Sequence, residues 1–275
     1  MPFVSDGRIL IQRAFENNYA MPSFNVCSLE MARACVEAAE AEKAPIILQT
    51  YPGDLEQGSP KVMAGMIKAL AEEASVPIML HLDHGDSADR VAQCIRAGYS
   101  SVMFDGEEYA LEENISRTRA LADFVHAAGA SIEAAAGSFG GGEGDHSEVH
   151  LTDPEVAEAL LSRGGADMVA CSVGSIHGQS SKLDIDRLEA IYKVAKKPLV
   201  LHGGSGIPAE DLAEAVKLGV VKVNIGAALF RALLGSWRQE AQGAEQHYPV
   251  MAAAREALRE VAITKIQIMK ASAKA

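Results

Sequence analysis

Residues 198–226, PLVLHGGSGIPAEDLAEAVKLGVVKVNIG, contain two apolar runs separated by a short segment with helical periodicity. The runs 198–203 and 220–226 are near-continuously apolar, as expected for parallel strands covered on both faces. Segment 208–218 opens with Pro208 and then two acids, which is typical of a helix start. The stretch therefore predicts a strand–helix–strand unit.

The same unit recurs along the whole chain. Further strands are predicted at 22–26, 44–50, 77–83, 100–105, 130–135 and 167–173, and further helices at 29–43, 60–75, 87–97, 108–128, 153–164, 184–196 and 227–241. Eight such units predict a single (β/α)₈ TIM-barrel domain over 1–275, with a doubly wound sheet as the alternative. An extra amphipathic C-terminal helix is predicted at 250–270, where we expect it to close the bottom of the barrel.

Composition limits the class of partner. With 25 basic and 37 acidic residues the net charge is −12, which repels phosphodiester backbones and anionic lipid. No apolar run is long enough for a transmembrane helix, and MPFVSDGRIL has no signal-peptide pattern. The four cysteines form no CxxC pair, which fits a reducing compartment. We expect a cytoplasmic protein that binds neither nucleic acid nor membrane.

Polar side chains collect where the predicted strands end, which is where TIM barrels carry their chemistry. The strand-end residues are Asn25, Gln49, Tyr51, Asp83, His84, Asp105, Glu133, His177, His202 and Asn224. Three of them are histidines that follow the third, sixth and seventh strands. Three histidines with one open position are a catalytic zinc geometry, although a single strand-end histidine is more often structural.

Glycine-rich turns follow the last two strands, at 202–208 and 224–226. In barrels this pair of turns commonly offers backbone N–H groups to a phosphate, although tight turns without a ligand are the alternative. A third glycine-rich segment, 137–148, follows the fifth strand and has no hydrophobic period. A segment of this length is typical of a functional flap or of a plain surface excursion.

A family resemblance emerges from motifs along the chain. They are YAMPSFN (19–25), HLDHG (81–85), FDG (104–106), IEA (132–134), HG (177–178), LHGGS (201–205) and KVN (222–224). In this order they resemble class II, zinc-dependent ketose-bisphosphate aldolases of the fructose- and tagatose-bisphosphate group, over essentially the whole chain.

The resemblance implies a catalytic zinc on His84, His177 and His202. It implies that Asp83 is the acid/base on the hydroxyl of the bond being broken, and that Glu143 moves the proton on the donor carbon. The implied reaction is reversible cleavage of a phosphorylated ketose to dihydroxyacetone phosphate and an aldehyde, through a zinc-stabilised enediolate.

Further residues and partners are implied by the same resemblance. A monovalent cation (Na⁺ or K⁺) near the glycine turns and assembly into a homodimer or homotetramer are both family features. The implied substrate- and phosphate-binding residues are Asn25, Gly178, Lys182, Gly203, Ser205, Asn224, Gly226 and Ala227.

The chain departs from the family pattern mainly on the acceptor side. Ala135 replaces an alternate metal ligand, so Asp105 and Glu133 are left as a weakened second metal site. Gly226-Ala227-Ala228 lacks the hydroxyl that usually contacts phosphate, and no arginine for a distal phosphate lies near 247–249. Gln49 and Tyr51 are then candidate acceptor-side residues. Because charge-assisted phosphate contacts are lost, we predict an aldolase not specialised for a 1,6-bisphosphate.

Two other functions remain open from the sequence. A zinc-dependent sugar-phosphate epimerase or isomerase would use the same metal site without cleaving a C–C bond. A non-catalytic aldolase-like partner subunit would show eroded metal ligands, whereas all three histidines are present.

Overall fold

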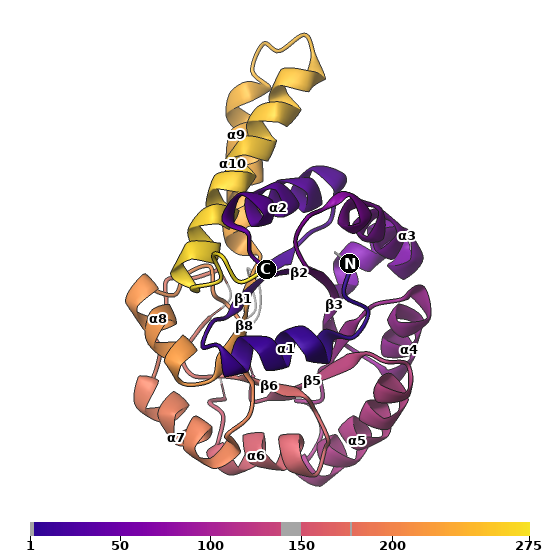
Figure 1. Ribbon diagram of the computed structural model, residues 1–275, viewed down its shortest axis with the longest axis vertical. Coiled ribbons are helices and arrows are strands. Elements are labelled where there is room, and N and C mark those ends of the chain that lie inside the picture. The colour runs from indigo at the N-terminus through magenta and orange to yellow at the C-terminus, as the bar shows by residue number, and fades with distance from the viewer. Residues whose placement is uncertain (1–2, 139–149, 177) are drawn as a thin grey trace.

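The computed structural model describes residues 3–138, 150–176 and 178–275. Eight parallel strands pair in chain order and close into a barrel, with helices around the outside (Figure 1). The predicted (β/α)₈ barrel is thereby confirmed. The strands are β1 (Met21–Asn25), β2 (Ile46–Thr50), β3 (Ile78–Gly85), β4 (Ser101–Phe104), β5 (Ser131–Ala136), β6 (Met168–Cys171), β7 (Leu199–Leu201) and β8 (Val220–Ile225).

The helices are α1 (Gly7–Glu16), α2 (Leu29–Glu42), α3 (Pro52–Glu73), α4 (Ala88–Ala97), α5 (Leu111–Ala127), α6 (Pro154–Ser162), α7 (Ile185–Ala195), α8 (Ala209–Lys217), α9 (Ala227–Glu240) and α10 (His247–Ile268). Helices α2 to α8 surround the barrel, and α1 crosses one of its ends (Figure 1).

One expectation about the helices was wrong. Helix α1, not the C-terminal helix, lies across the amino-terminal end of the barrel, where the Gly7 N–H donates to the Ser100 carbonyl just before β4 (3.1 Å). Helix α10 instead packs against α2 and α9, and the α9–α10 hairpin projects beyond the barrel (Figure 1). The extra C-terminal helix itself is confirmed.

Helix α3 starts earlier than predicted. The predicted helix spans 60–75, but α3 begins at Pro52 and passes through a kink at Ser59, whose φ is 51°. Pro60 removes a backbone donor at this kink and its ring restricts Ser59, so the periodicity is broken there. The extra turns matter for function because they place Tyr51, Pro52 and Asp54 at the mouth of the barrel.

The strands are buried on both faces, as their near-continuous apolar sequences predict. The polar residues at their carboxyl ends therefore point into a protein interior or a cavity, not into bulk water. Registers such as Ser23↔Asn224 and Gln49↔His81 bring polar residues from neighbouring strands level with one another. The barrel thus gathers side chains that are far apart in the sequence.

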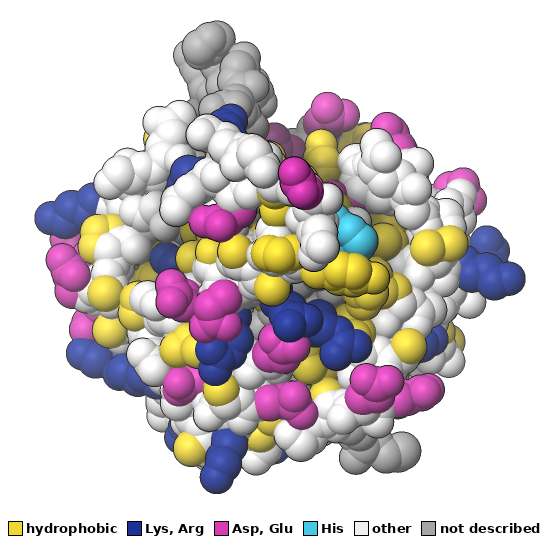
Figure 2. All heavy atoms as spheres, turned by 90° about the horizontal axis from the view of Figure 1, so that it is seen from above, with side chains coloured by type: hydrophobic (Ala, Val, Ile, Leu, Met, Phe, Trp, Pro, Cys, Tyr) yellow, Lys and Arg dark blue, Asp and Glu magenta, His cyan; other side chains and the backbone are white. Residues whose placement is uncertain are grey.

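The surface carries charges of both signs. Lys and Arg side chains are interspersed with Asp and Glu on the face shown in Figure 2. Within the described ranges, no helix is both long enough and apolar enough to cross a membrane.

Candidate active site

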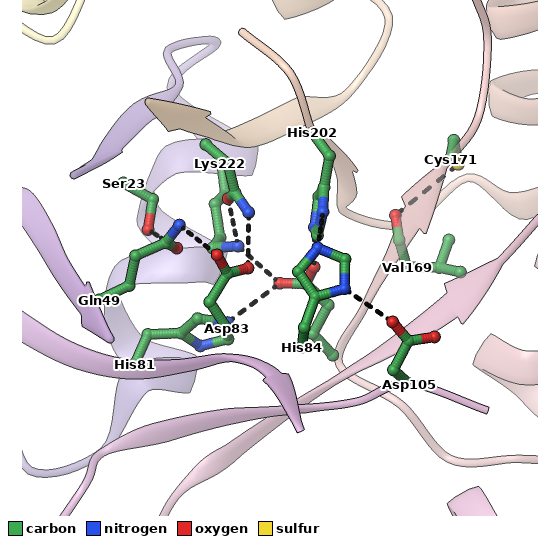
Figure 3. Close-up of polar contacts among 12 residues, drawn as sticks. Ser23, Gln49, His81, Asp83, His84, Asp105, Val169, Cys171, His202 and Lys222 are labelled. Atoms are coloured by element: carbon green, nitrogen blue, oxygen red, sulfur yellow. Dashed lines mark hydrogen bonds and ion pairs between the residues drawn. The ribbon is translucent and has the colours of Figure 1, made fainter. Parts of the chain in front are cut away.

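A cavity of about 780 Å³ opens at the carboxyl ends of the barrel strands. Most of the sequence-predicted site residues line it: Asn25, Tyr51, Asp83, His84, Asp105, Gly178, Gly203, Ser205, Asn224, Gly226 and Ala227. Gln49 and His202 are buried beside this cavity (Figure 3), and Glu133 is buried in contact with His202. Lys182 is exposed and does not line it.

Two histidines meet at the floor of the cavity. The Nε2 atom of His84 and the Nδ1 atom of His202 lie 3.0 Å apart (Figure 3). The opposite ring nitrogen of each histidine contacts a carboxylate: Asp105 for His84 at 2.7 Å, and Glu133 for His202 at 3.0 Å. A carboxylate on the outer nitrogen fixes the orientation of an imidazole and raises its basicity, as in zinc sites.

This arrangement fits a bound metal ion. Ligand atoms of Asp83, His84 and His202 all lie within 4.8 Å of one another. Imidazole nitrogens are ligands that zinc prefers, and each histidine already has its outer partner. The structure thus places Asp105 and Glu133 behind the two histidines. His177, the third predicted ligand, and Glu143, the predicted donor-side base, lie outside the described residues.

The backbone at His84 is in an unusual conformation. Its φ is 49°, in the left-handed region, and the β3–β4 register shifts between Leu82 and Gly85. A non-glycine residue in this region persists only where the surroundings hold it, and such positions concentrate at functional sites. The bulge turns His84 toward the cavity directly after Asp83, so two consecutive residues serve the same site.

Asp83 is held by three side-chain amides. Its carboxylate accepts hydrogen bonds from Asn25 (2.8 Å), Gln49 (3.0 Å) and Asn224 (2.8 Å). Burial alone would raise its pKa, but the positive charges nearby, His84 first, and the bond from Asn25 lower the pKa of Asp83 to about 2. The carboxylate is therefore ionised at neutral pH and lies beside the two histidines.

A buried ion pair supports this network from inside the barrel. Lys222 and Glu133 have fully buried side chains, with Nζ and Oε2 2.9 Å apart. Lys222 also donates to the Asn224 oxygen (2.6 Å), which leaves the Asn224 NH₂ group facing Asp83. His81 is fully buried and its Nε2 lies 3.5 Å from Glu133; burial, first of all, places the pKa of His81 well below its usual range.

Lys222 and Ser23 lie in the quoted motifs, but the sequence alone gave neither of them a role. Ser23 donates to the Gln49 oxygen, so it orients that amide toward Asp83 (Figure 3). A signal for Lys222 was available: it lies two residues before Asn224, on the same side of β8. The apolar neighbours of Lys222 show it as part of a buried strand, where a charged residue is unusual unless it is paired.

The glycines that line the cavity follow β6, β7 and β8, which lie across the closed barrel from β2, β3 and β4. Gly178 and Gly203 have φ values of 73° and 68°, which a side chain would strain. The Ser205 hydroxyl accepts from the Ala228 N–H at the start of α9 (3.1 Å). Backbone N–H groups at a helix start favour an anion, so these turns are suited to a phosphate.

Acidic side chains line the rest of the cavity. They are Asp54, Asp86, Glu107 and Glu108. Burial, and to a lesser extent the charge of Asp83, raise the pKa of Asp54. Among the described residues, no Lys or Arg lines the cavity, and residues 1–2, 139–149 and 177 include neither type. Asp86 is paired with Arg90 (3.4 Å), and the other carboxylates make this side of the cavity unfavourable for an anionic group.

Comparisons with known proteins give consistent matches over nearly the whole chain. The family model described as fructose-bisphosphate aldolase class-II matches residues 6–274. The chain is 36% identical over 278 residues to a probable fructose-bisphosphate aldolase of Bacillus subtilis (strain 168), covering 97% of each chain. It is 39% identical over 244 residues to a fructose-bisphosphate aldolase of Streptococcus pyogenes serotype M6, covering 86% of this chain and 83% of the relative.

Solved structures show the same architecture. The YdjI aldolase from Escherichia coli K12 superposes with a TM-score of 0.89 at 30% identity, over 98% of both chains. A putative fructose-1,6-bisphosphate aldolase from Coccidioides immitis gives a TM-score of 0.90 at 27% identity, over 97% of this chain and 96% of that one.

Proposed function

The chain belongs to the class II fructose-bisphosphate aldolase family and is a metal-dependent aldolase, and we propose that it uses zinc to cleave a ketose phosphate into dihydroxyacetone phosphate and an aldehyde. The observation that carries the proposal is the ionised Asp83 carboxylate, fixed by three amides beside the converging His84 and His202. An aldolase needs a base at the hydroxyl of the bond that breaks, next to a group that polarises the ketone.

His84, His202 and, by the resemblance, His177 would hold the zinc ion. When bound, zinc supplies Lewis-acid polarisation of the substrate ketone. The neighbouring carboxylates of Asp105 and Glu133 keep the ligand nitrogens of His84 and His202 turned toward that position. We keep Na⁺ or K⁺ near the glycine turns as a family expectation.

In cleavage, Asp83 takes the proton from the substrate hydroxyl while the adjacent C–C bond breaks, and the hydroxyl carbon leaves as an aldehyde. The electron pair of the broken bond stays on the donor carbon, where Glu143 delivers a proton. In synthesis, Asp83 returns its proton to the aldehyde oxygen. Asn25, Gln49 and Asn224 hold the Asp83 oxygens in place throughout.

The donor phosphate is assigned to the glycine side of the cavity, at Gly178, Gly203, Ser205, Gly226 and Ala227. Lys182 is close in sequence to this side but is exposed, so its predicted contact with the anion remains a proposal.

The acceptor end of the substrate lies on the acidic side of the cavity, near Tyr51. The carboxylates of Asp54 and Glu108 would repel a second phosphate there, and no Lys or Arg of the described chain lines the cavity. We therefore propose a ketose 1-phosphate with an uncharged far end, not a 1,6-bisphosphate. Tyr51, which is 49% exposed, gives that end an amphipathic surface.

The first experiment follows the donor half-reaction alone. Zinc-loaded protein is incubated with dihydroxyacetone phosphate in D₂O, and loss of one hydroxymethyl proton is followed by NMR. We expect metal-dependent, stereospecific exchange that stops with a chelator or with Glu143→Ala. Because Asp83 serves the acceptor, Asp83→Asn should retain exchange but lose C–C cleavage, whereas Asp89→Asn, on the exposed start of α4, should change neither. No exchange by the zinc-loaded protein would overturn the proposal.

A second experiment tests the acceptor end. We expect kcat/KM for a ketose 1-phosphate to exceed that for the matching 1,6-bisphosphate by roughly tenfold, or about 1.4 kcal/mol, because the second phosphate meets carboxylates and no lysine or arginine on this side. Glu108→Gln should narrow this gap by raising kcat/KM for the bisphosphate. A preference for the bisphosphate in the unmodified protein would show that the acidic side does not select the substrate.

A further inference from the structure

The last helix reaches one of the glycine turns of the active site. Lys265, in the last turn of α10, directs its ammonium group to the backbone carbonyls of Gly204 (3.0 Å) and Ser205 (3.4 Å). These carbonyls belong to the turn 203–206, which follows β7 and lines the cavity through Gly203 and Ser205. Helix α10 is otherwise remote from the cavity, so this contact connects the C-terminal helix to the site.

The turn has little freedom to move on its other sides. The Gly204 N–H donates to the Asn224 carbonyl in β8 (3.0 Å), and the Ser205 hydroxyl accepts from Ala228. A Cβ atom at Gly204 would come within 2.2 Å of Val223, so the turn lies directly against β8. The Gly206 carbonyl also accepts from the Ser181 N–H (3.2 Å), and Lys265 adds a contact that carries a full charge.

The Lys265 ammonium group offsets the negative charge of the two carbonyl oxygens that it contacts. Backbone carbonyl oxygens carry partial negative charge, which opposes a phosphate bound nearby. A lysine ammonium on two carbonyls compensates that charge and orients both peptide groups. The neighbouring turn has a similar contact, because Arg231 of α9 donates to the Gly178 carbonyl (3.3 Å).

Lys265 is half-buried, and burial, followed by the charge of Arg231, lowers its pKa. Water therefore replaces a missing ammonium poorly at this position. Removal of the charge should leave the Gly204 and Ser205 carbonyls without an equivalent partner.

We propose that Lys265 is a positioning residue that acts as a tethered cation and holds the turn 203–206 in the conformation that binds the phosphate of the substrate. The proposal rests on the proposed function, because the phosphate is assigned to this side of the cavity. Lys265 touches the turn and not the substrate, so it acts on phosphate affinity through the backbone of Gly204 and Ser205.

Binding of dihydroxyacetone phosphate to the zinc-loaded protein, measured by calorimetry, tests the role directly. Lys265→Met keeps the apolar stem and removes the charge. We expect its Kd to rise roughly tenfold, because charge-assisted hydrogen bonds change equilibrium constants by about tenfold or more. In steady-state assays the loss should appear in KM more than in kcat. Lys270→Met, an exposed lysine just beyond the same helix, is the matched control and should bind like the unmodified protein.

Chemical rescue separates a tethered cation from a purely structural brace. Lys265→Ala removes the stem as well, and added ethylammonium should restore most of its affinity, whereas uncharged propanol should not. A variant that keeps its near-UV circular dichroism and binds dihydroxyacetone phosphate with unchanged Kd would overturn the role of Lys265, as would an Ala variant restored equally by propanol. If Lys265→Met does not fold, Lys265→Gln, which keeps a donor without the charge, replaces it.

The two proposals fail differently. If the unmodified protein neither binds dihydroxyacetone phosphate nor exchanges its proton, the proposed function is overturned, and the role of Lys265 with it. If the unmodified protein does both and Lys265→Met matches it, only the role of Lys265 is overturned.

Discussion

Replacing Lys222 by Met tests whether the ion pair inside the barrel holds the catalytic site together. Lys222 and Glu133 are fully buried, and their charged atoms lie 2.9 Å apart. Met has a similar volume and leaves the Glu133 carboxylate buried without its cation. Breaking one partner of a buried pair costs about 3–5 kcal/mol in unfolding free energy. The Asn224 oxygen also loses its donor, which lies 2.6 Å away. Because both losses come from the same lysine, the 3–5 kcal/mol covers them together.

Equilibrium unfolding in urea with metal-free protein measures this free energy without a contribution from metal binding. For a domain of this size, the loss corresponds to a melting temperature roughly 6–20 °C lower. The matched control is Lys217→Met in the exposed Lys217–Glu214 pair, where we expect a change of about 1 kcal/mol or less.

The pair of Lys222→Met and Glu133→Gln completes a double-mutant cycle. The double variant should be more stable than the sum of the two single effects predicts, by at least about 2 kcal/mol, because no buried charge is left unpaired. Its activity should stay low, since the Asn224 amide has lost the contact that orients it toward Asp83. A Lys222→Met variant that loses less than about 1 kcal/mol, or fully additive effects, would refute this reasoning.

Three further predictions concern metal, pH and assembly. A chelator should abolish cleavage, and added Zn²⁺ should restore it. Zn²⁺ at a thousand times its Kd should add about 4 kcal/mol to the unfolding free energy and raise the melting temperature. An unchanged melting temperature would argue against the metal site. Burial opposes the charged form of His84, but Asp83 and Asp105 raise its pKa to about 9, above the ordinary 6.5. Since the pKa of His84 is higher in the folded state, protonated His84 stabilises the fold fully below pH 6.5, and this contribution is lost as pH rises through 9. The melting temperature of metal-free protein should therefore fall between these pH values. His84→Asn should make the melting temperature depend less on pH over the same range. We expect a homodimer or homotetramer by native mass spectrometry, and polar substitution of the exposed Trp237 and Tyr248 on the projecting hairpin should lower its order; an unchanged assembly would place the interface elsewhere.

The fold follows from the sequence because each strand carries its own signal. Runs such as 44–50 and 220–226 are mostly apolar, and a parallel sheet covered on both faces buries such strands completely. Closure into a barrel follows from the repetition of the unit. The place of α10 could not be predicted, because an apolar stripe shows that a helix packs but not against which partner. The early start of α3 was hidden by Gly53, Gly58 and Pro60, which interrupt its period.

The site was predictable in its residue types and less so in its pairings. The strand ends identify Asp83, His84 and His202 as neighbours, since all carboxyl ends of a parallel barrel meet on one face. That Asp105 lies behind His84, and Glu133 behind His202, depends on strand register and on the bulge in β3. Sequence gives no register between strands that are separated by long helices. The same residues, Asp105 and Glu133, are therefore expected whether they orient the histidines or form a second metal site.

The hydrogen bonds of the polar network run from donors inside the barrel toward the Asp83 carboxylate. Lys222 can only donate, so the Asn224 oxygen must face it and the Asn224 NH₂ must face Asp83. Likewise, the Ser23 hydroxyl donates to the Gln49 oxygen and leaves the Gln49 NH₂ for Asn25 and Asp83. Each amide is thus locked in one orientation by a donor deeper in the barrel. Because the amides of Asn25, Gln49 and Asn224 all donate to Asp83, the buried residues that stabilise the barrel interior also keep this carboxylate ionised and its position fixed, which an acceptor-side base requires.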